Sequence, residues 1–170
     1  MNLAPNPQLS GEIVSVSDGM VGVEQTLAKM RQLVQKARVS LPIRQAATQI
    51  VFLTPEKDQF SEGEALFNFV RDTIRYVRDV HQVETLQSPE ITLATKMGDC
   101  DDQTTLLASM LEAIGYPTRF VVAGYHDPRS VEHVYLQAYL GNEWIDMDAT
   151  EQHQMGWYPP DALAMAYERV

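Results

Sequence analysis

Cysteine is almost absent from this chain, because its 170 residues include a single one, Cys100. One thiol cannot form an internal disulfide, and it cannot supply the several thiolates of a structural zinc site. Long apolar runs are absent as well, since no segment approaches the ~18 residues that a membrane-spanning helix needs. The first residues lack the basic and apolar regions of a secretory signal. We therefore expect a cytoplasmic protein with no disulfide and no membrane segment.

Basic residues are scarce in the second half of the chain. Residues 81–170 contain four Lys or Arg against fourteen Asp or Glu, whereas residues 1–80 contain nine of each class. An acidic surface repels the phosphate backbone of DNA and RNA. We therefore expect no nucleic-acid partner, and a polypeptide or a small molecule is more compatible with this charge.

Repeats and low-complexity segments are also absent, and a hydrophobic content of 45% is sufficient for one globular core. Apolar residues at helical spacing predict two helices, over residues 23–34 and 43–51. A third predicted helix begins at a capping box, residues 61–64, and its apolar stripe continues to Val77.

The segment that follows has no sustained period. Residues 78–98 have mixed polarity with Pro89 in the middle, which predicts a long surface loop. For the domain organisation, we expect residues 1–60 to be an N-terminal extension whose two helices pack on the core. Residues 61–170 are then one globular unit.

The second half of the chain changes from helical to β-type patterning. A buried helix is predicted to begin at or next to Cys100 and to end before Gly115 and Pro117. The β-prone segments after it cover residues 119–124, 132–140 and 143–148. Helices followed by an antiparallel sheet predict an α+β fold.

Cys100 is the first candidate for chemistry. At a helix N-terminus, unpaired N–H groups and the positive end of the helix dipole stabilise a thiolate, which is the nucleophilic form. The neighbours Asp99, Asp101 and Asp102 oppose this effect, because like charges disfavour a thiolate. Activation therefore needs a nearby imidazolium. The three carboxylates could attract calcium, but they lack EF-hand spacing and fit helix capping better, so we expect no metal or cofactor.

The predicted hairpin supplies a histidine and a carboxylate. A two-residue turn at Gly141 and Asn142 pairs the flanking strands so that alternate residues share a polar face. On that face Asp148 is the diagonal neighbour of His133, whereas Asp146 lies one pair further away. The register therefore favours Asp148 as the partner of His133.

Cys100, His133 and Asp148 thus provide the parts of Cys-His-Asp nucleophilic catalysis in that chain order. The blocks around them are GDCDD (98–102), GYPTR (115–119), EHV (132–134) and WIDMDAT (144–150). Together these blocks resemble the transglutaminase-like superfamily, and RYVRD (75–79) resembles its small bacterial and phage-type members.

The resemblance implies a papain-like core, in which the nucleophile helix packs on the antiparallel sheet. It also implies a cysteine hydrolase that cleaves a protein or peptide substrate through a thioester. Transamidation, with an amine in place of water, is one alternative. A non-catalytic peptide-binding or morphogenesis protein of phage type that retains the fold is the other.

Two further groups of residues complete the sequence-based hypothesis. For the oxyanion, the Cys100 amide is one candidate donor and Gln87 is the second, because the glutamine typical of papain-like enzymes has no counterpart just before Cys100. For the substrate cleft, we select Trp157 and Tyr158 from the aromatic segment after Asp148, and Tyr135 from the polar face. That aromatic segment could instead pack on the core.

Overall fold

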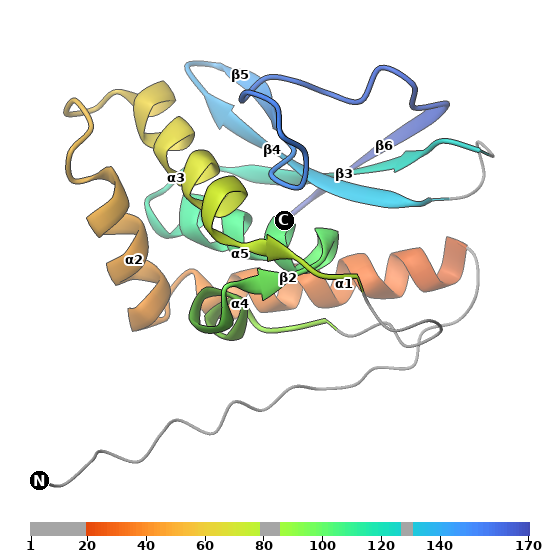
Figure 1. The fold of residues 1–170 in the computed structure, drawn as a ribbon, viewed down its shortest axis with the longest axis horizontal. Coiled ribbons are helices and arrows are strands. Elements are labelled where there is room, and N and C mark those ends of the chain that lie inside the picture. Colours follow the sequence, from red (N-terminus) through yellow and green to blue (C-terminus); the bar gives the residue numbers. More distant parts are fainter. Residues whose placement is uncertain (1–19, 79–85, 127–130) are drawn as a thin grey trace, which may run out of the picture.

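The chain begins with helices and ends with an antiparallel sheet, as expected for an α+β fold (Figure 1). The computed structural model describes residues 20–78, 86–126 and 131–170. The helices are α1 (Met20–Ala37), α2 (Leu41–Val51), α3 (Gln59–Thr73), α4 (Pro89–Thr95) and α5 (Cys100–Ala113). The strands are β1 (Arg75–Tyr76), β2 (Met97–Gly98), β3 (Thr118–Gly124), β4 (His133–Leu140), β5 (Glu143–Met147) and β6 (Ala164–Arg169). Within these ranges no helix is both long and apolar enough to cross a membrane.

The sheet has the order β5-β4-β3-β6, and every neighbouring pair is antiparallel. Helix α5 contacts β4 and β3 and also packs against α1, α2, α3 and α4, so it lies between the sheet and the other helices (Figure 1). Strands β1 and β2 form a separate parallel pair. The central position of α5 explains why ten consecutive residues, 102–111, are buried.

The hairpin between β4 and β5 has the predicted register. Gly141 and Asn142 have φ of 56° and 73°, the positive values that a tight two-residue hairpin turn requires. Leu140 pairs with Glu143, and the ladder continues with the same alternation until it ends at Met147. Asp148 therefore follows the strand directly and is not itself part of the ladder.

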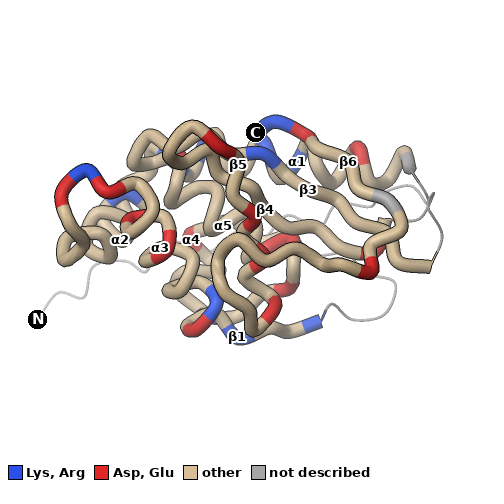
Figure 2. The backbone as a smooth tube through the Cα atoms, turned by 90° about the horizontal axis from the view of Figure 1, so that it is seen from above, with Lys and Arg blue, Asp and Glu red and all other residues tan. Residues whose placement is uncertain are grey.

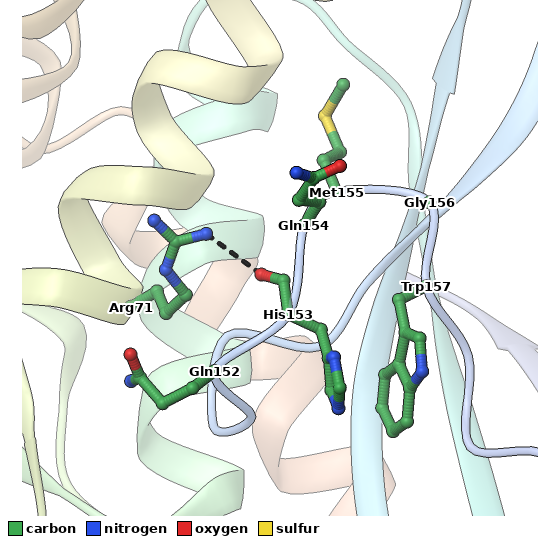
Figure 3. Close-up of a pocket in the computed structure, with 7 residues that line it drawn as sticks. All are labelled: Arg71, Gln152, His153, Gln154, Met155, Gly156 and Trp157. Atoms are coloured by element: carbon green, nitrogen blue, oxygen red, sulfur yellow. Dashed lines mark hydrogen bonds between the residues drawn. The ribbon is translucent and has the colours of Figure 1, made fainter.

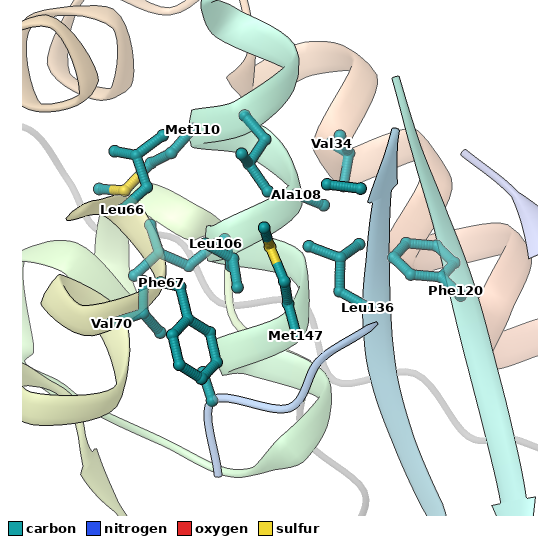
Figure 4. Close-up of a cluster of buried hydrophobic side chains, with 14 of the residues drawn as sticks. Val34, Leu66, Phe67, Val70, Leu106, Ala108, Met110, Phe120, Leu136 and Met147 are labelled. Atoms are coloured by element: carbon teal, nitrogen blue, oxygen red, sulfur yellow. The ribbon is translucent and has the colours of Figure 1, made fainter. Parts of the chain in front are cut away.

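The core lies between the inner face of the sheet and the helices (Figure 4). Helix α1 contributes Val34, α3 contributes Phe67 and α5 contributes Leu106, while the sheet contributes Phe120 and Leu136; all five side chains are fully buried. Helices α1 and α2 thus contribute to the same core as the rest of the chain. A division of the chain at residues 60 and 61 would fall inside α3, so that predicted boundary does not coincide with a gap between elements.

The start of α3 differs from the prediction. The capping residue is Asp58, whose carboxylate accepts hydrogen bonds from the Ser61 amide at 3.1 Å and the Ser61 hydroxyl at 2.6 Å. The capping box at residues 61–64 was therefore wrong, because a good cap existed three residues earlier. The helix also ends at Thr73, so the last members of the predicted apolar stripe, Ile74 and Val77, lie outside it, on either side of β1.

Two other elements were missed. Helix α4 and strand β2 lie in the segment that was predicted to be a loop, because Pro89 begins a helix there instead of interrupting one. Strand β6 was not predicted, since its alanines have low β-propensity. It forms because six of its residues pair with β3, from Ala164 opposite Gly124 to Arg169 opposite Arg119.

Candidate active site

Helix α5 begins at Cys100, as predicted. The Asp99 side chain caps the helix by accepting a hydrogen bond from the Asp102 amide at 3.1 Å. The segment before the cap is β2, which pairs with β1. Val77, the residue after β1, extends this pairing, because its amide donates to the Gly98 carbonyl at 3.1 Å. The amide of Cys100 is therefore one of the first N–H groups of the helix, which have no acceptor within the helix itself.

The environment of the Cys100 thiol favours its protonated form. The side chain is half-buried, and its Sγ lies 3.6 Å from Asp101 Oδ1, to which the thiol donates. Burial raises the pKa of Cys100 most, and the negative charges of Asp101 and Asp99 raise it further, whereas a backbone hydrogen bond from Val134 lowers it. The aspartates therefore disfavour the thiolate form of Cys100, as the sequence predicts.

The sheet reaches the start of α5 at the first residues of β4. Thr104 Oγ1, on the second turn of α5, donates to the Val134 carbonyl at 3.2 Å, and the Val134 backbone is close enough to the Cys100 thiol to lower its pKa. Because His133 immediately precedes Val134, the bond from Thr104 holds the histidine backbone next to the start of α5.

His133 makes the predicted contact with Asp148. Its Nε2 lies 2.7 Å from Asp148 Oδ2, and the carboxylate side chain is only 1% exposed. The other carboxylate oxygen accepts from the Thr150 amide at 3.2 Å and the Thr150 hydroxyl at 2.7 Å. The carboxylate is thus held in place, and it leaves Nδ1 as the imidazole nitrogen that is not engaged with Asp148.

The competing carboxylate, Asp146, has a different role. Its Oδ1 accepts from the Tyr135 hydroxyl at 3.0 Å and from Gln137 Nε2 at 2.7 Å. The preference for Asp148 over Asp146 as the partner of His133 is confirmed. Tyr135 is only 1% exposed and stacks against the His133 ring, so it supports the histidine and does not line an open cleft, contrary to the prediction.

Gln87 lies next to the start of α5 but is engaged with another residue. Its backbone amide donates to Asp102 Oδ1 at 2.8 Å, and its Nε2 donates to Asp102 Oδ2 at 2.7 Å. These two bonds hold the segment before α4 against the first turn of α5 and satisfy the buried Asp102 carboxylate. A role for Gln87 as oxyanion donor stays a prediction.

Of the two remaining cleft candidates, one lines a cavity. Trp157 borders a cavity of about 720 Å³ together with Arg71 and residues 152–156 (Figure 3). Tyr158 is 55% exposed and is not among the residues that line this cavity. A second cavity of about 300 Å³ is bordered by Tyr76, Gln103, Ala149 and Thr150, among others.

Tyr76 was missed by the sequence analysis although it lies near the thiol. Burial raises the pKa of Tyr76, and so does the negative charge of Asp99 at the start of α5. The parallel pairing of β1 with β2, which places Tyr76 opposite Gly98, is responsible for this proximity. A two-residue parallel pair gives no pattern that a sequence could reveal. Figure 2 shows basic and acidic segments side by side around β1.

The charged residues of the site do not form a metal centre within the described ranges. No group of three or more His, Cys, Asp or Glu side chains is placed there to hold an ion. Asp99 is used as the helix cap and Asp102 as the acceptor for Gln87, which accounts for two of the three clustered aspartates.

The effect of Asp101 on the thiol can be tested directly. We expect Asp101→Asn to lower the pKa of Cys100, because the substitution removes the nearest negative charge and the best acceptor for the thiol proton. If the pKa of Cys100 decreases by one unit, the thiolate fraction at pH 7.5 increases by about tenfold, and the alkylation rate with iodoacetamide increases with it. Glu143→Gln, at the exposed hairpin turn, is the control. An unchanged rate in Asp101→Asn would contradict the explanation.

Comparison with known proteins is consistent with this arrangement. The model of the transglutaminase-like superfamily matches residues 44–149, a range that contains Cys100, His133 and Asp148. A search of curated proteins found no significant match.

Solved structures provide the fold comparison. Calcium-bound LapG of Legionella pneumophila is 20% identical with a TM-score of 0.55, and the match covers 80% of each chain. A candidate cysteine protease of Cytophaga hutchinsonii is 20% identical with a TM-score of 0.52, over 74% of this chain and 45% of that one. A candidate protease of Parabacteroides distasonis is 11% identical with a TM-score of 0.58, over 76% and 27%. The chain therefore spans less than half the length of the last two proteins.

These likenesses show the fold, and the match to the family model covers more than half of the sequence. The helix that begins at the cysteine, the antiparallel sheet that presents the histidine and the segment that carries the aspartate follow in the order that the resemblance implied. The chain belongs to the transglutaminase-like superfamily.

Proposed function

We propose that this protein is a cysteine hydrolase of peptide or amide bonds, in which Cys100 is the nucleophile, His133 the proton carrier and Asp148 the residue that orients His133. The observation that carries the proposal is the 2.7 Å hydrogen bond between His133 Nε2 and the buried Asp148 carboxylate. His133 begins β4, and the next residue, Val134, accepts a hydrogen bond from Thr104 near the start of the helix that begins at Cys100. A buried carboxylate that is satisfied by Thr150 and by an imidazole is well suited to fix one tautomer of that imidazole.

The proton moves during the reaction rather than before it. Because burial and the aspartates keep Cys100 protonated, Nδ1 of His133 accepts the thiol proton as Sγ attacks the substrate carbonyl. The Sγ–C bond forms, the C–N bond breaks, and the imidazolium returns the proton to the leaving amine. Water then attacks the thioester with His133 again as base, which releases a carboxylic acid and regenerates the thiol.

The negative charge that develops on the carbonyl oxygen requires hydrogen-bond donors. The backbone amide of Cys100 is suitable, since it is at the first position of α5 and has no intrahelical acceptor. The positive end of the α5 dipole favours the same charge.

The experiment is incubation of the protein with a proteome-derived peptide pool, followed by mass spectrometry of the new termini. Hydrolysis predicts new termini that depend on Cys100 and are absent with Cys100→Ala. A parallel reaction with a primary amine detects transamidation, because that amine would appear on the acyl product in place of water. A wild-type protein that produces neither product would contradict the proposal.

One observation favours a second candidate, a non-catalytic peptide-binding protein that retains the fold. The raised pKa of Cys100 leaves little thiolate at neutral pH, which a binding protein tolerates and an enzyme must overcome. For this candidate, Cys100→Ala would keep the full biological function, whereas the hydrolase would lose it with an unchanged fold.

A further inference from the structure

Two neighbouring cavities lie between the end of α3, helix α5 and the segment that follows Asp148. The smaller one, about 300 Å³, is bordered by Gln103, one turn after Cys100, and by Ala149, which directly follows Asp148. The larger one, about 720 Å³, extends to Trp157. Both are bordered by Arg71 and Gln152, so they are neighbours, and we call their combined surface the 149–157 groove. The groove extends from Gln103 and Ala149, which are close in sequence to Cys100 and Asp148, to the aromatic side chain of Trp157.

Hydrogen bonds hold the walls of the groove. Arg71 extends from α3 and donates to the His153 carbonyl at 2.9 Å (Figure 3). The other two nitrogens of its guanidinium, Nε and Nη2, donate to the Asp72 carboxylate. The guanidinium carbon Cζ lies 5.2 Å from the centre of the Phe67 ring. On the opposite side the Gly156 amide donates to the Asp146 carbonyl at 2.7 Å. A site fixed in this way needs little ordering when a ligand binds.

The polar side chains of the groove suit a peptide chain. Arg71 and Asp72 are paired with each other, so they offer little to a free anion. Arg75, which also borders the smaller cavity, is exposed and hydrogen-bonds Met97. The amide side chains of Gln152 and Gln154 can hydrogen-bond a peptide backbone. Gln103 is 1% exposed, and its Oε1 has no hydrogen-bond partner among the described residues, so a peptide N–H would supply the missing donor.

At the far end, the rings of His153 and Trp157 stack face to face. Their ring centres are 4.0 Å apart with an angle of 17° between the planes, and the two rings lie side by side in Figure 3. His153 is exposed and Trp157 is half-buried, so a ligand can reach the pair. A further flat ring can stack on the outer face of the exposed His153 ring.

We propose that the 149–157 groove binds the substrate as an extended peptide and that an aromatic or proline side chain of the substrate stacks on the His153–Trp157 pair. This inference rests on the proposed hydrolase function, because it names the substrate class of the same site. Because the groove is rigid, the substrate residue that stacks on this pair always lies the same number of residues from the cleaved bond. The protein therefore prefers an aromatic residue or proline at that one substrate position.

The test is the positional preference of cleavage in the peptide pool. Wild-type protein is expected to show enrichment of Phe, Tyr, Trp or Pro at that position. Trp157→Ala is expected to reduce cleavage of those peptides by about three- to tenfold and to abolish the enrichment, whereas Trp157→Phe retains it. Tyr167→Ala is the control, since Tyr167 is an exposed aromatic residue on β6 that borders neither cavity.

The possible results separate the two proposals. An unchanged positional preference in folded Trp157→Ala would overturn the groove assignment and leave hydrolysis standing. A wild-type protein that cleaves no peptide would instead overturn the proposed function itself. If Trp157→Ala does not fold, His153→Ala removes the other, exposed ring and must cause the same loss of preference.

Discussion

We expect Asp148→Asn to lower peptide hydrolysis by about 10³- to 10⁴-fold, by analogy with the loss of the orienting carboxylate in a Ser-His-Asp triad. An asparagine can keep its oxygen on the Thr150 hydroxyl and amide. Its NH₂ group then faces His133 Nε2, which has to become an acceptor. The imidazole proton moves to Nδ1, and that nitrogen can no longer take the proton of Cys100.

The matched control for this substitution is Asp146→Asn. Asp146 lies on β5, two residues before Asp148. It accepts hydrogen bonds from Tyr135 and Gln137 and makes none with His133. Initial rates on a peptide that the wild type cleaves, together with thermal melting of both variants, provide the comparison. Equal losses in folded Asp146→Asn and Asp148→Asn would mean that orientation of His133 is not the cause.

The largest expected effect on stability is that of Phe67→Ala. Phe67 lies on α3 at 0% exposure, within the core between the helices and the sheet (Figure 4). Removing the ring eliminates its buried apolar surface and leaves a cavity that the packed neighbours can fill only in part. We expect a loss of about 3–5 kcal/mol in the free energy of unfolding. At about 2–4 °C per kcal/mol for a chain of this size, the melting temperature falls by about 10 °C.

Phe52→Ala is the control for the core substitution. The Phe52 side chain is 79% exposed after the end of α2, so its truncation is expected to change the free energy of unfolding by no more than about 0.5 kcal/mol. Urea denaturation measured by far-UV circular dichroism gives both values. A loss below about 1 kcal/mol for Phe67→Ala would show that α3 is not an integral part of the core.

The candidate site was predictable where local patterns determine geometry. The cap at Asp99 and the apolar run after it place Cys100 at a helix N-terminus without reference to the rest of the chain. The tight turn at Gly141 and Asn142 fixes the register of β4 and β5, because side chains alternate strictly between the faces of a strand. His133 and Asp148 then lie within reach of each other.

Patterns failed where an element depends on partners that are distant in the sequence. Strand β6 contains alanines with low β-propensity and forms only because β3 offers a free edge. The proximity of Tyr76 to Cys100 depends on a two-residue parallel pair. The engagement of Gln87 depends on the burial of Asp102.

The sequence by itself determined the order and identity of the chemical groups, the start of the nucleophile helix and the register of the hairpin, since each follows from local spacing. Only the tertiary structure decided the protonation of Cys100, because burial and the position of Val134 both enter its pKa. It also decided which surface is open beside Gln103 and Ala149. Arg71 and His153 are 82 residues apart, and only folding brings them together as two walls of one groove.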